Sequence, residues 1–239
     1  TDEGSQWRSL IKSWIGKNAP EKGFSEELTA KLREYFEEYV DPTLLWLKVN
    51  AKAVLPLEDM NLVTSFLWML DGTLDKTNTA DEEQLEIVFV FCFIWAVGAG
   101  LCVSDDGTDY KKLFSDWWRN EWKNVKFPSR ETVFDYWLDP SVNGFEQWTK
   151  SPYFFTIDYN STTPMGDVTV PTPETCSVSF WMEKLVDMRR PVMLVGPAGT
   201  GKTQMIQGLL NSFKDPSVYV SCNINFNFYT TSQVLFNTM

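Results

Sequence analysis

The chain has 239 residues, of which 44% are hydrophobic, and its formal net charge is -11 at pH 7. A chain of this length can bury the core of one large domain or of two ordinary ones. Its 32 acidic residues outnumber its 21 basic ones, and no lysine or arginine cluster offsets that excess, so we expect no nucleic-acid partner.

The side chains that usually hold zinc are scarce. The sequence has no histidine, and its four cysteines stand far apart without a C-x-x-C pair. We therefore expect neither a zinc site nor histidine-based catalysis. Framework disulfides are typical of short secreted chains, and the start of this sequence lacks the pattern of a signal peptide. The sequence predicts reduced thiols in a cytoplasmic protein.

Residues 7–124 carry a helical pattern almost throughout. In "FSEELTAKLREYFEEYV" apolar residues recur at three- and four-residue spacing, with Ser25 as the expected N-cap and Asp41-Pro42 as the expected stop. "LEDMNLVTSFLWML" repeats the pattern, and we expect Asp71-Gly72 to end its helix. "DYKKLFSDWWRNEW" predicts a further helix. Its tryptophans could form a ligand platform, but their helical spacing favours a place in the core.

The most apolar stretch, residues 87–103, contains 17 uncharged residues, which is the lower limit for a membrane helix. Its flanks are acidic, with Glu86 before it and Asp105 after it, so no positive-inside signal is present. We therefore favour a helix that is buried on all sides over a membrane span. Thr79 and Glu82 have the spacing of a capping box ahead of it.

The spacing of the apolar residues changes after residue 124. "TVFDYWL" and "YFFTIDY" predict extended segments, separated by turn-rich sequence that contains Asn143-Gly144. A loop dense in threonine and proline follows. We then expect a helix over residues 176–189, with Thr175 as its N-cap and Pro191 beyond its end.

The last part of the chain predicts β-α-β order. "VMLV", residues 192–195, has the composition of a buried strand, and "SVYVSC", residues 217–222, has that of a second one. Between them lie a glycine-rich loop and a predicted helix over residues 202–213. This order is typical of a phosphate-binding α/β unit.

The glycine-rich loop matches G-x-x-x-x-G-K-[ST] at every position. Glycines let the backbone curl so that successive N–H groups face a phosphate at a helix N-terminus. Lys202 would reach the β- and γ-phosphates of ATP, and the Thr203 hydroxyl would ligate Mg²⁺. The alternative, a glycine-rich turn without a ligand, leaves Lys202 unexplained. The predicted nucleotide-binding residues are Gly196, Pro197, Ala198, Gly199, Thr200, Gly201, Lys202 and Thr203, with Thr203 also the predicted metal ligand.

No acidic residue follows residue 216. Hydrolysis by a P-loop enzyme needs a carboxylate that holds Mg²⁺ and a group that orients water. We therefore name no catalytic residue, and we expect the 239 residues alone to lack ATPase activity.

Several stretches resemble dynein heavy chains of the axonemal type. "VPTPETCSVSFWMEKLVDMRRPVMLVGPAGTGKT" is similar to the entrance of a dynein AAA+ module, and "FDYWLDPSVNGFEQW" to the start of the third module of the ring. "WRSLIKSWI" and "NLVTSFLWMLDGTL" resemble the helical subdomain that closes the second module. Only "TDEGS" finds no counterpart.

The resemblance implies an α/β AAA+ P-loop NTPase fold in two parts. Residues 1–125 would form the helical small (lid) subdomain of one module, and residues 126–239 the N-terminal part of the next α/β subdomain. The rest of both modules would lie before residue 1 and after residue 239. Val170, Pro171 and Thr172 match the loop that borders adenine in such modules.

The resemblance also implies a function. The parent protein would be a motor ATPase that moves along microtubules in the axoneme of a cilium or flagellum. This third site would bind ATP or ADP with Mg²⁺ and regulate the main motor site. The partners would be neighbouring AAA+ modules of the same heavy chain, with intermediate chains, light chains and microtubules bound through other regions, and no membrane.

Two other functions stay open from the sequence. One is an AAA+ remodelling ATPase outside the dyneins, although a self-contained AAA+ unit would place its helical lid after its own sheet. The other is a scaffold whose loop no longer binds nucleotide. Under the dynein interpretation, the strands at 192–195 and 218–222 lack sheet neighbours within these residues, so we expect them to be weakly protected from hydrogen exchange.

Overall fold

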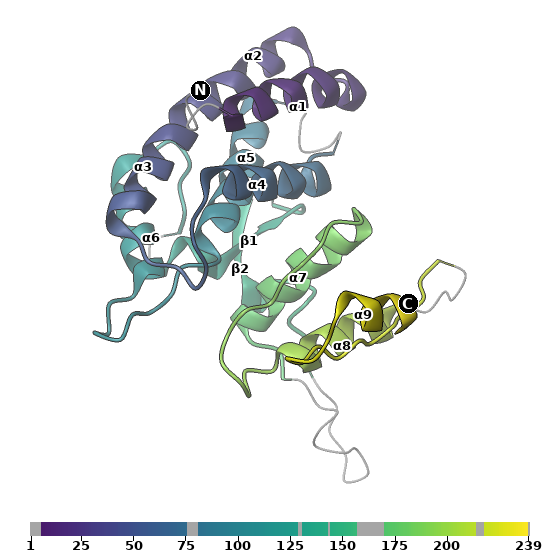
Figure 1. Ribbon diagram of the computed structural model, residues 1–239. Coiled ribbons are helices and arrows are strands. Elements are labelled where there is room, and N and C mark those ends of the chain that lie inside the picture. The colour runs from purple at the N-terminus through teal and green to yellow at the C-terminus, as the bar shows by residue number, and fades with distance from the viewer. Residues whose placement is uncertain are drawn as a thin grey trace. The chain divides into compact units, whose positions relative to one another are not determined.

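The computed structural model describes residues 6–75, 81–128, 131–142, 144–156, 170–213 and 218–238. The chain divides into two compact units, residues 1–200 and 201–239, and each is described by itself. The helices of the first unit are α1 (Gln6–Lys22), α2 (Glu26–Tyr35), α3 (Asp41–Asn50), α4 (Asp59–Thr73), α5 (Glu82–Gly98), α6 (Tyr110–Glu121) and α7 (Pro173–Asp187) (Figure 1). The second unit contains α8 (Lys202–Ser212) and α9 (Ser232–Thr238).

Helices α2 and α3 form one continuous helical run. Ser25 caps α2 as predicted, since its hydroxyl accepts a hydrogen bond from the Leu28 N–H at 3.1 Å. The predicted stop at Asp41-Pro42 is wrong, because a π-helical turn over Phe36–Val40 carries the chain directly into α3. Pro42 lies in the first turn of α3, where its missing N–H and fixed φ are tolerated.

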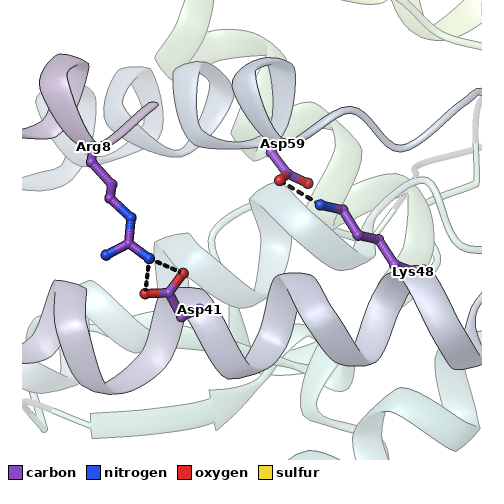
Figure 2. Close-up of polar contacts among 4 residues, drawn as sticks. All are labelled: Arg8, Asp41, Lys48 and Asp59. Carbon is purple, nitrogen blue, oxygen red and sulfur yellow. Dashed lines mark hydrogen bonds and ion pairs between the residues drawn. The ribbon is translucent and has the colours of Figure 1, made fainter. Parts of the chain in front are cut away.

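Two ion pairs connect α3 to its neighbours (Figure 2). The Arg8 guanidinium of α1 donates to both carboxylate oxygens of Asp41, at 2.8 and 2.7 Å. Lys48 donates to Asp59, the first residue of α4, at 2.6 Å. Because both pairs are partly exposed, their net contribution to stability is small. The buried leucines of α3 provide its apolar contact with the core.

Helix α5 is the centre of the helical core. Every side chain from Val88 to Trp95 is at most 6% exposed, so the helix is buried on all sides as predicted. Within the described part of the chain, no helix is long and apolar enough to cross a bilayer. Asp81 caps α5 by accepting from the Gln84 N–H at 2.8 Å. The predicted capping box of Thr79 and Glu82 is wrong for this helix, because Asp81 is the N-cap and Glu82 is the first helical residue; Thr79 itself lies outside the described residues.

Helices α4 and α6 match the sequence pattern closely. Helix α4 ends at Thr73, so the predicted stop at Asp71-Gly72 falls inside its last turn. The tryptophans of α6 belong to the core, as predicted: Trp118 is buried, and Trp117 stacks on Trp46 of α3 with ring centroids 4.8 Å apart.

A short hairpin follows the helical region. Strands β1 (Tyr136–Asp139) and β2 (Gly144–Gln147) pair antiparallel. The extended segment predicted from residue 132 starts late, because Val133–Asp135 form a 3-10 turn whose N-cap is Thr132. The second predicted segment is wrong in its described part: residues 153–156 form no strand, and residues 157–159 lie outside the described residues.

Helix α7 starts three residues earlier than predicted. Thr172, not Thr175, is its N-cap, because Pro173 occupies the first turn. Thr172 and Thr175 bond reciprocally: the Thr175 N–H donates to the Thr172 hydroxyl at 3.2 Å, and the Thr172 N–H donates to the Thr175 hydroxyl at 2.8 Å. The helix ends at Asp187, before the expected residue 189.

The predicted parallel strands are wrong for the described residues. Residues 192–195 and 218–222 belong to no helix or strand, and residue 217 is not described. Met193 is 70% exposed and Val220 is 89% exposed. A parallel strand needs a hydrogen-bonded neighbour in the same sheet, and the one sheet among the described residues is the β1-β2 hairpin. The helix between the two segments, α8, forms as predicted.

Candidate nucleotide site

The loop predicted to bind phosphate runs directly into α8. Gly199 and Gly201 have φ angles of 80° and 79°, in the left-handed region that side-chain-bearing residues rarely adopt. Gly201 is the N-cap of α8, and Lys202 is the first helical residue. The sequence therefore supplies glycine at the two positions of the loop where the backbone requires it.

The loop also carries its own hydrogen bond. The Thr200 hydroxyl donates to the Pro197 carbonyl at 3.0 Å, which closes the turn on itself. Gly196 has room for a β-carbon, since an added one would lie 3.7 Å from the Thr200 hydroxyl oxygen. Packing within the loop therefore does not require a glycine at position 196.

Lys202 and Thr203 lie in the first turn of α8. That turn contains no acidic residue, so no side chain within it offsets the partial positive charge of the helix N-terminus. Thr203 is exposed. An exposed hydroxyl is an oxygen ligand of the kind that Mg²⁺ prefers. No cluster of three or more cysteines and carboxylates that could hold a metal occurs in the described ranges.

The three residues matched to an adenine-bordering loop lie at the start of α7. Val170 is 65% exposed, and Pro171 is half-buried. Thr172 has a structural role that the sequence analysis missed, because its hydroxyl and its N–H are both used in the cap of α7. The T-x-x-T spacing was the available signal.

Helix α7, which leads toward the loop, is anchored on the helical core by aromatic contacts. Phe91 of α5 stacks on Trp181 with ring centroids 5.2 Å apart, and Trp95 lies 6.3 Å from the same ring. Phe180 packs edge-on against Trp148, at 5.6 Å. The aromatic core is thus continuous from α5 to α7.

The turn between α7 and residue 192 was also missed by the sequence analysis. Arg189 has a φ of 53°, in the left-handed region where a helix usually ends on glycine. The Arg189 N–H donates to the Val186 carbonyl at 2.8 Å, and the Arg190 N–H donates to the Leu185 carbonyl at 2.8 Å. This is the Schellman pattern. No glycine marks it in the sequence, so the residue pattern gives no signal of this turn.

The cysteines give no sign of thiol chemistry. All four are unpaired, and Cys92 and Cys176 are buried. Burial raises the pKa of Cys92 to about 12, and burial likewise raises the pKa of Cys176. These two thiols are therefore protonated at neutral pH and are not activated nucleophiles.

Two family models match the sequence. The dynein heavy chain AAA lid domain matches residues 32–150, and the P-loop containing dynein motor region matches residues 157–239. The residues matched to the lid model therefore precede those matched to the motor-region model.

Full-length relatives extend the match over nearly the whole chain. The Dynein alpha chain of the flagellar outer arm of Chlamydomonas reinhardtii is 38% identical over 239 residues, covering 95% of this chain. Dynein axonemal heavy chain 9 of Homo sapiens is 38% identical, and the ciliary Dynein beta chain of Tripneustes gratilla is 37% identical, each over 96% of this chain. This chain spans 5% of the length of each of the three. The two dynein family models and these relatives together show that the chain belongs to the dynein heavy chain family.

Proposed function

We propose that residues 196–203 bind the phosphates of ATP or ADP in a dynein motor ring. The observation that carries the proposal is the pair of left-handed glycines, Gly199 and Gly201, inside a complete phosphate-loop motif that continues into α8. Lys202 supplies the positive charge for the β- and γ-phosphates. Gly196 to Thr200 supply backbone N–H groups, as such loops do.

Thr203 would hold Mg²⁺ together with the phosphate oxygens. The metal ion, when bound, neutralises charge that develops on the phosphates. Within this chain the residues bind and orient the nucleotide, and no carboxylate after residue 216 is available to position water. We therefore propose that these 239 residues alone do not hydrolyse ATP.

We propose a module boundary near residue 125. Residues 1–125 would be the lid of the second AAA+ module, and residues 126–239 the first part of the third module. The order of the two family matches supports a lid that precedes a P-loop region, and the lid match itself extends to residue 150. Val170, Pro171 and Thr172 would border adenine, with the Thr172 hydroxyl engaged in the helix cap.

In the parent heavy chain this site would regulate ATP-driven movement along microtubules. Relatives whose names specify the flagellar outer arm and the axoneme support a location in a cilium or flagellum. The direct partners of this segment would be neighbouring AAA+ modules. Intermediate chains, light chains and microtubules would bind elsewhere on the heavy chain.

The test is Lys202→Ala in an intact heavy chain that carries this sequence, with its other nucleotide sites disabled. Loss of a charge-assisted contact of about 1.5–3 kcal/mol should weaken nucleotide binding at this site by about ten- to a hundredfold. Equilibrium titration with a fluorescent ATP analogue measures the change. Equal affinity in the variant and the unaltered chain would refute the site and favour a scaffold.

A further inference from the structure

Arg190 connects the end of α7 to helix α4. Its guanidinium carbon lies 5.1 Å from the centroid of the Trp68 ring. Its Nε is buried and has no hydrogen-bond partner among the described atoms. Removing part of a guanidinium from water needs compensating interactions, and the face of an indole ring provides one of the strongest that an apolar side chain can offer.

A carboxylate on the same helix lies within the electrostatic range of Arg190. Burial raises the pKa of Asp71, and the positive charges of Lys22, Arg190 and Lys17 act in the opposite direction. The Asp71 carboxylate accepts a hydrogen bond from the Trp14 indole N–H at 2.9 Å.

The C-terminal ends of α4 and α7 lie close together. A β-carbon added at Gly72 would lie 3.4 Å from the side chain of Met188 and 3.6 Å from the Lys184 carbonyl oxygen. The left-handed turn at Arg189 then directs the chain so that Arg190 reaches Trp68. A non-glycine residue in this conformation persists only where the surrounding structure determines it.

Only five residues, 191–195, separate Arg190 from Gly196, the first residue of the phosphate loop. These five residues belong to no helix or strand, and the Arg190 contact is an anchor close to the loop on its N-terminal side. A connector of five residues can span only a limited distance. Movement of the loop therefore pulls on or pushes against the Arg190 contact.

We propose that Arg190 is a positioning residue that fixes the segment before the phosphate loop to α4, so that nucleotide binding at the loop and the conformation of α4 are coupled. The inference rests on the proposed nucleotide site and assigns a route for its regulation. Coupling of this kind is reciprocal: if nucleotide stabilises α4, the α4 contact must favour nucleotide binding to the same extent.

The test is hydrogen exchange in an intact heavy chain that carries this sequence, with and without Mg-ATP and with the other nucleotide sites disabled. In the unaltered chain, nucleotide should slow exchange at residues 201–206 and at residues 66–73. In Arg190→Gln it should slow exchange only at residues 201–206, and nucleotide affinity should fall about fivefold, the lower end of common coupling factors.

Arg189→Gln is the matched control, because it removes the same charge from the adjacent residue and leaves the contact with Trp68. It should respond to nucleotide as the unaltered chain does. Trp68→Leu removes the other half of the contact and should abolish the response in the same way. The double variant of Arg190 and Trp68 should lose no more nucleotide affinity, and no more of the response at residues 66–73, than either single variant, since the same contact is removed in each case.

The outcomes separate the inference from the proposed function. Absence of slowing at residues 201–206 in the unaltered chain refutes nucleotide binding at this loop. Slowing there without a response at residues 66–73, or an unchanged response in Arg190→Gln, refutes the coupling and leaves the nucleotide site intact. A purely structural role for Arg190 would raise exchange at residues 66–73 equally with and without nucleotide and would leave their difference unchanged, which also refutes the coupling.

Discussion

At the scale of single residues, Gly98 shows how tightly the helical core meets the sequence that follows it. A β-carbon there would lie 2.3 Å from Cζ of Phe134 and 2.7 Å from its Cε1. The Phe134 ring is itself enclosed, with Trp95 at 5.5 Å and Phe114 at 5.9 Å between ring centroids. The ring therefore has little room to move away.

We expect Gly98→Ala to destabilise the chain by about 1–3 kcal/mol through overpacking. Gly16→Ala in α1 is the control, because nothing lies within 4 Å of an added β-carbon there. That control should stabilise the helix by up to about 1 kcal/mol through helix propensity alone. Urea denaturation of both variants measures the difference, and equal stability would contradict the packing argument.

A second prediction at this scale concerns the metal ligand. Thr203→Ser keeps an oxygen of nearly the same reach and should retain Mg²⁺-dependent nucleotide binding, whereas Thr203→Val removes the oxygen and should lose it. Titration of nucleotide with and without Mg²⁺, in the intact heavy chain, measures both variants. Mg-ATP binding by the valine variant at the affinity of the unaltered chain would show that Thr203 is not a ligand.

At the scale of elements, the caps decide where the helices begin. Asp81 is followed by two glutamates in the first turn of α5, which complement the helix dipole. We expect Asp81→Ala to cost about 1 kcal/mol of unfolding free energy, since it leaves the Gln84 N–H at the start of α5 without its cap. Asp105→Ala, an exposed acidic residue outside any helix, is the control for charge. Thermal unfolding that shifts equally in both variants would contradict the capping role.

The sequence predicts elements whose causes are local and misses those whose causes lie elsewhere in the fold. Helical periodicity identifies α2, α4, α5, α6 and α8, and a serine cap places the start of α2. The expectation that Asp41-Pro42 ends a helix is wrong, because the π-helical turn at Phe36–Val40 continues the helix past this point. The left-handed Arg189 is set by its surroundings and leaves no glycine in the sequence. In the candidate site, the motif places glycine at positions 199 and 201, where the backbone is left-handed, whereas the Arg190 contact depends on Trp68, which is far away in the sequence.

At the scale of the whole molecule, the hydrophobic core and the phosphate loop have different structural support. Buried residues of the core extend from Trp7 to Trp181 in one cluster. The segments on either side of α8 have no such support, since residues 192–195 and 218–222 expose most of their apolar side chains. A parallel sheet is stable when it is covered on both faces, and uncovered apolar strands favour aggregation.

We therefore expect uneven protection in the isolated 239-residue chain. Amides of α4 and α5 should exchange slowly, because their hydrogen bonds lie in the buried core, whereas amides of residues 192–195 and 218–222 should exchange quickly. The same chain should bind Mg-ATP weakly, because residues 217–239 contain no carboxylate to support the metal ion. Hydrogen exchange with peptide resolution and equilibrium dialysis with Mg-ATP measure the two properties. Strong protection of both segments together with micromolar affinity would mean that these residues complete a sheet and a site on their own, and the proposed division between modules would then be wrong.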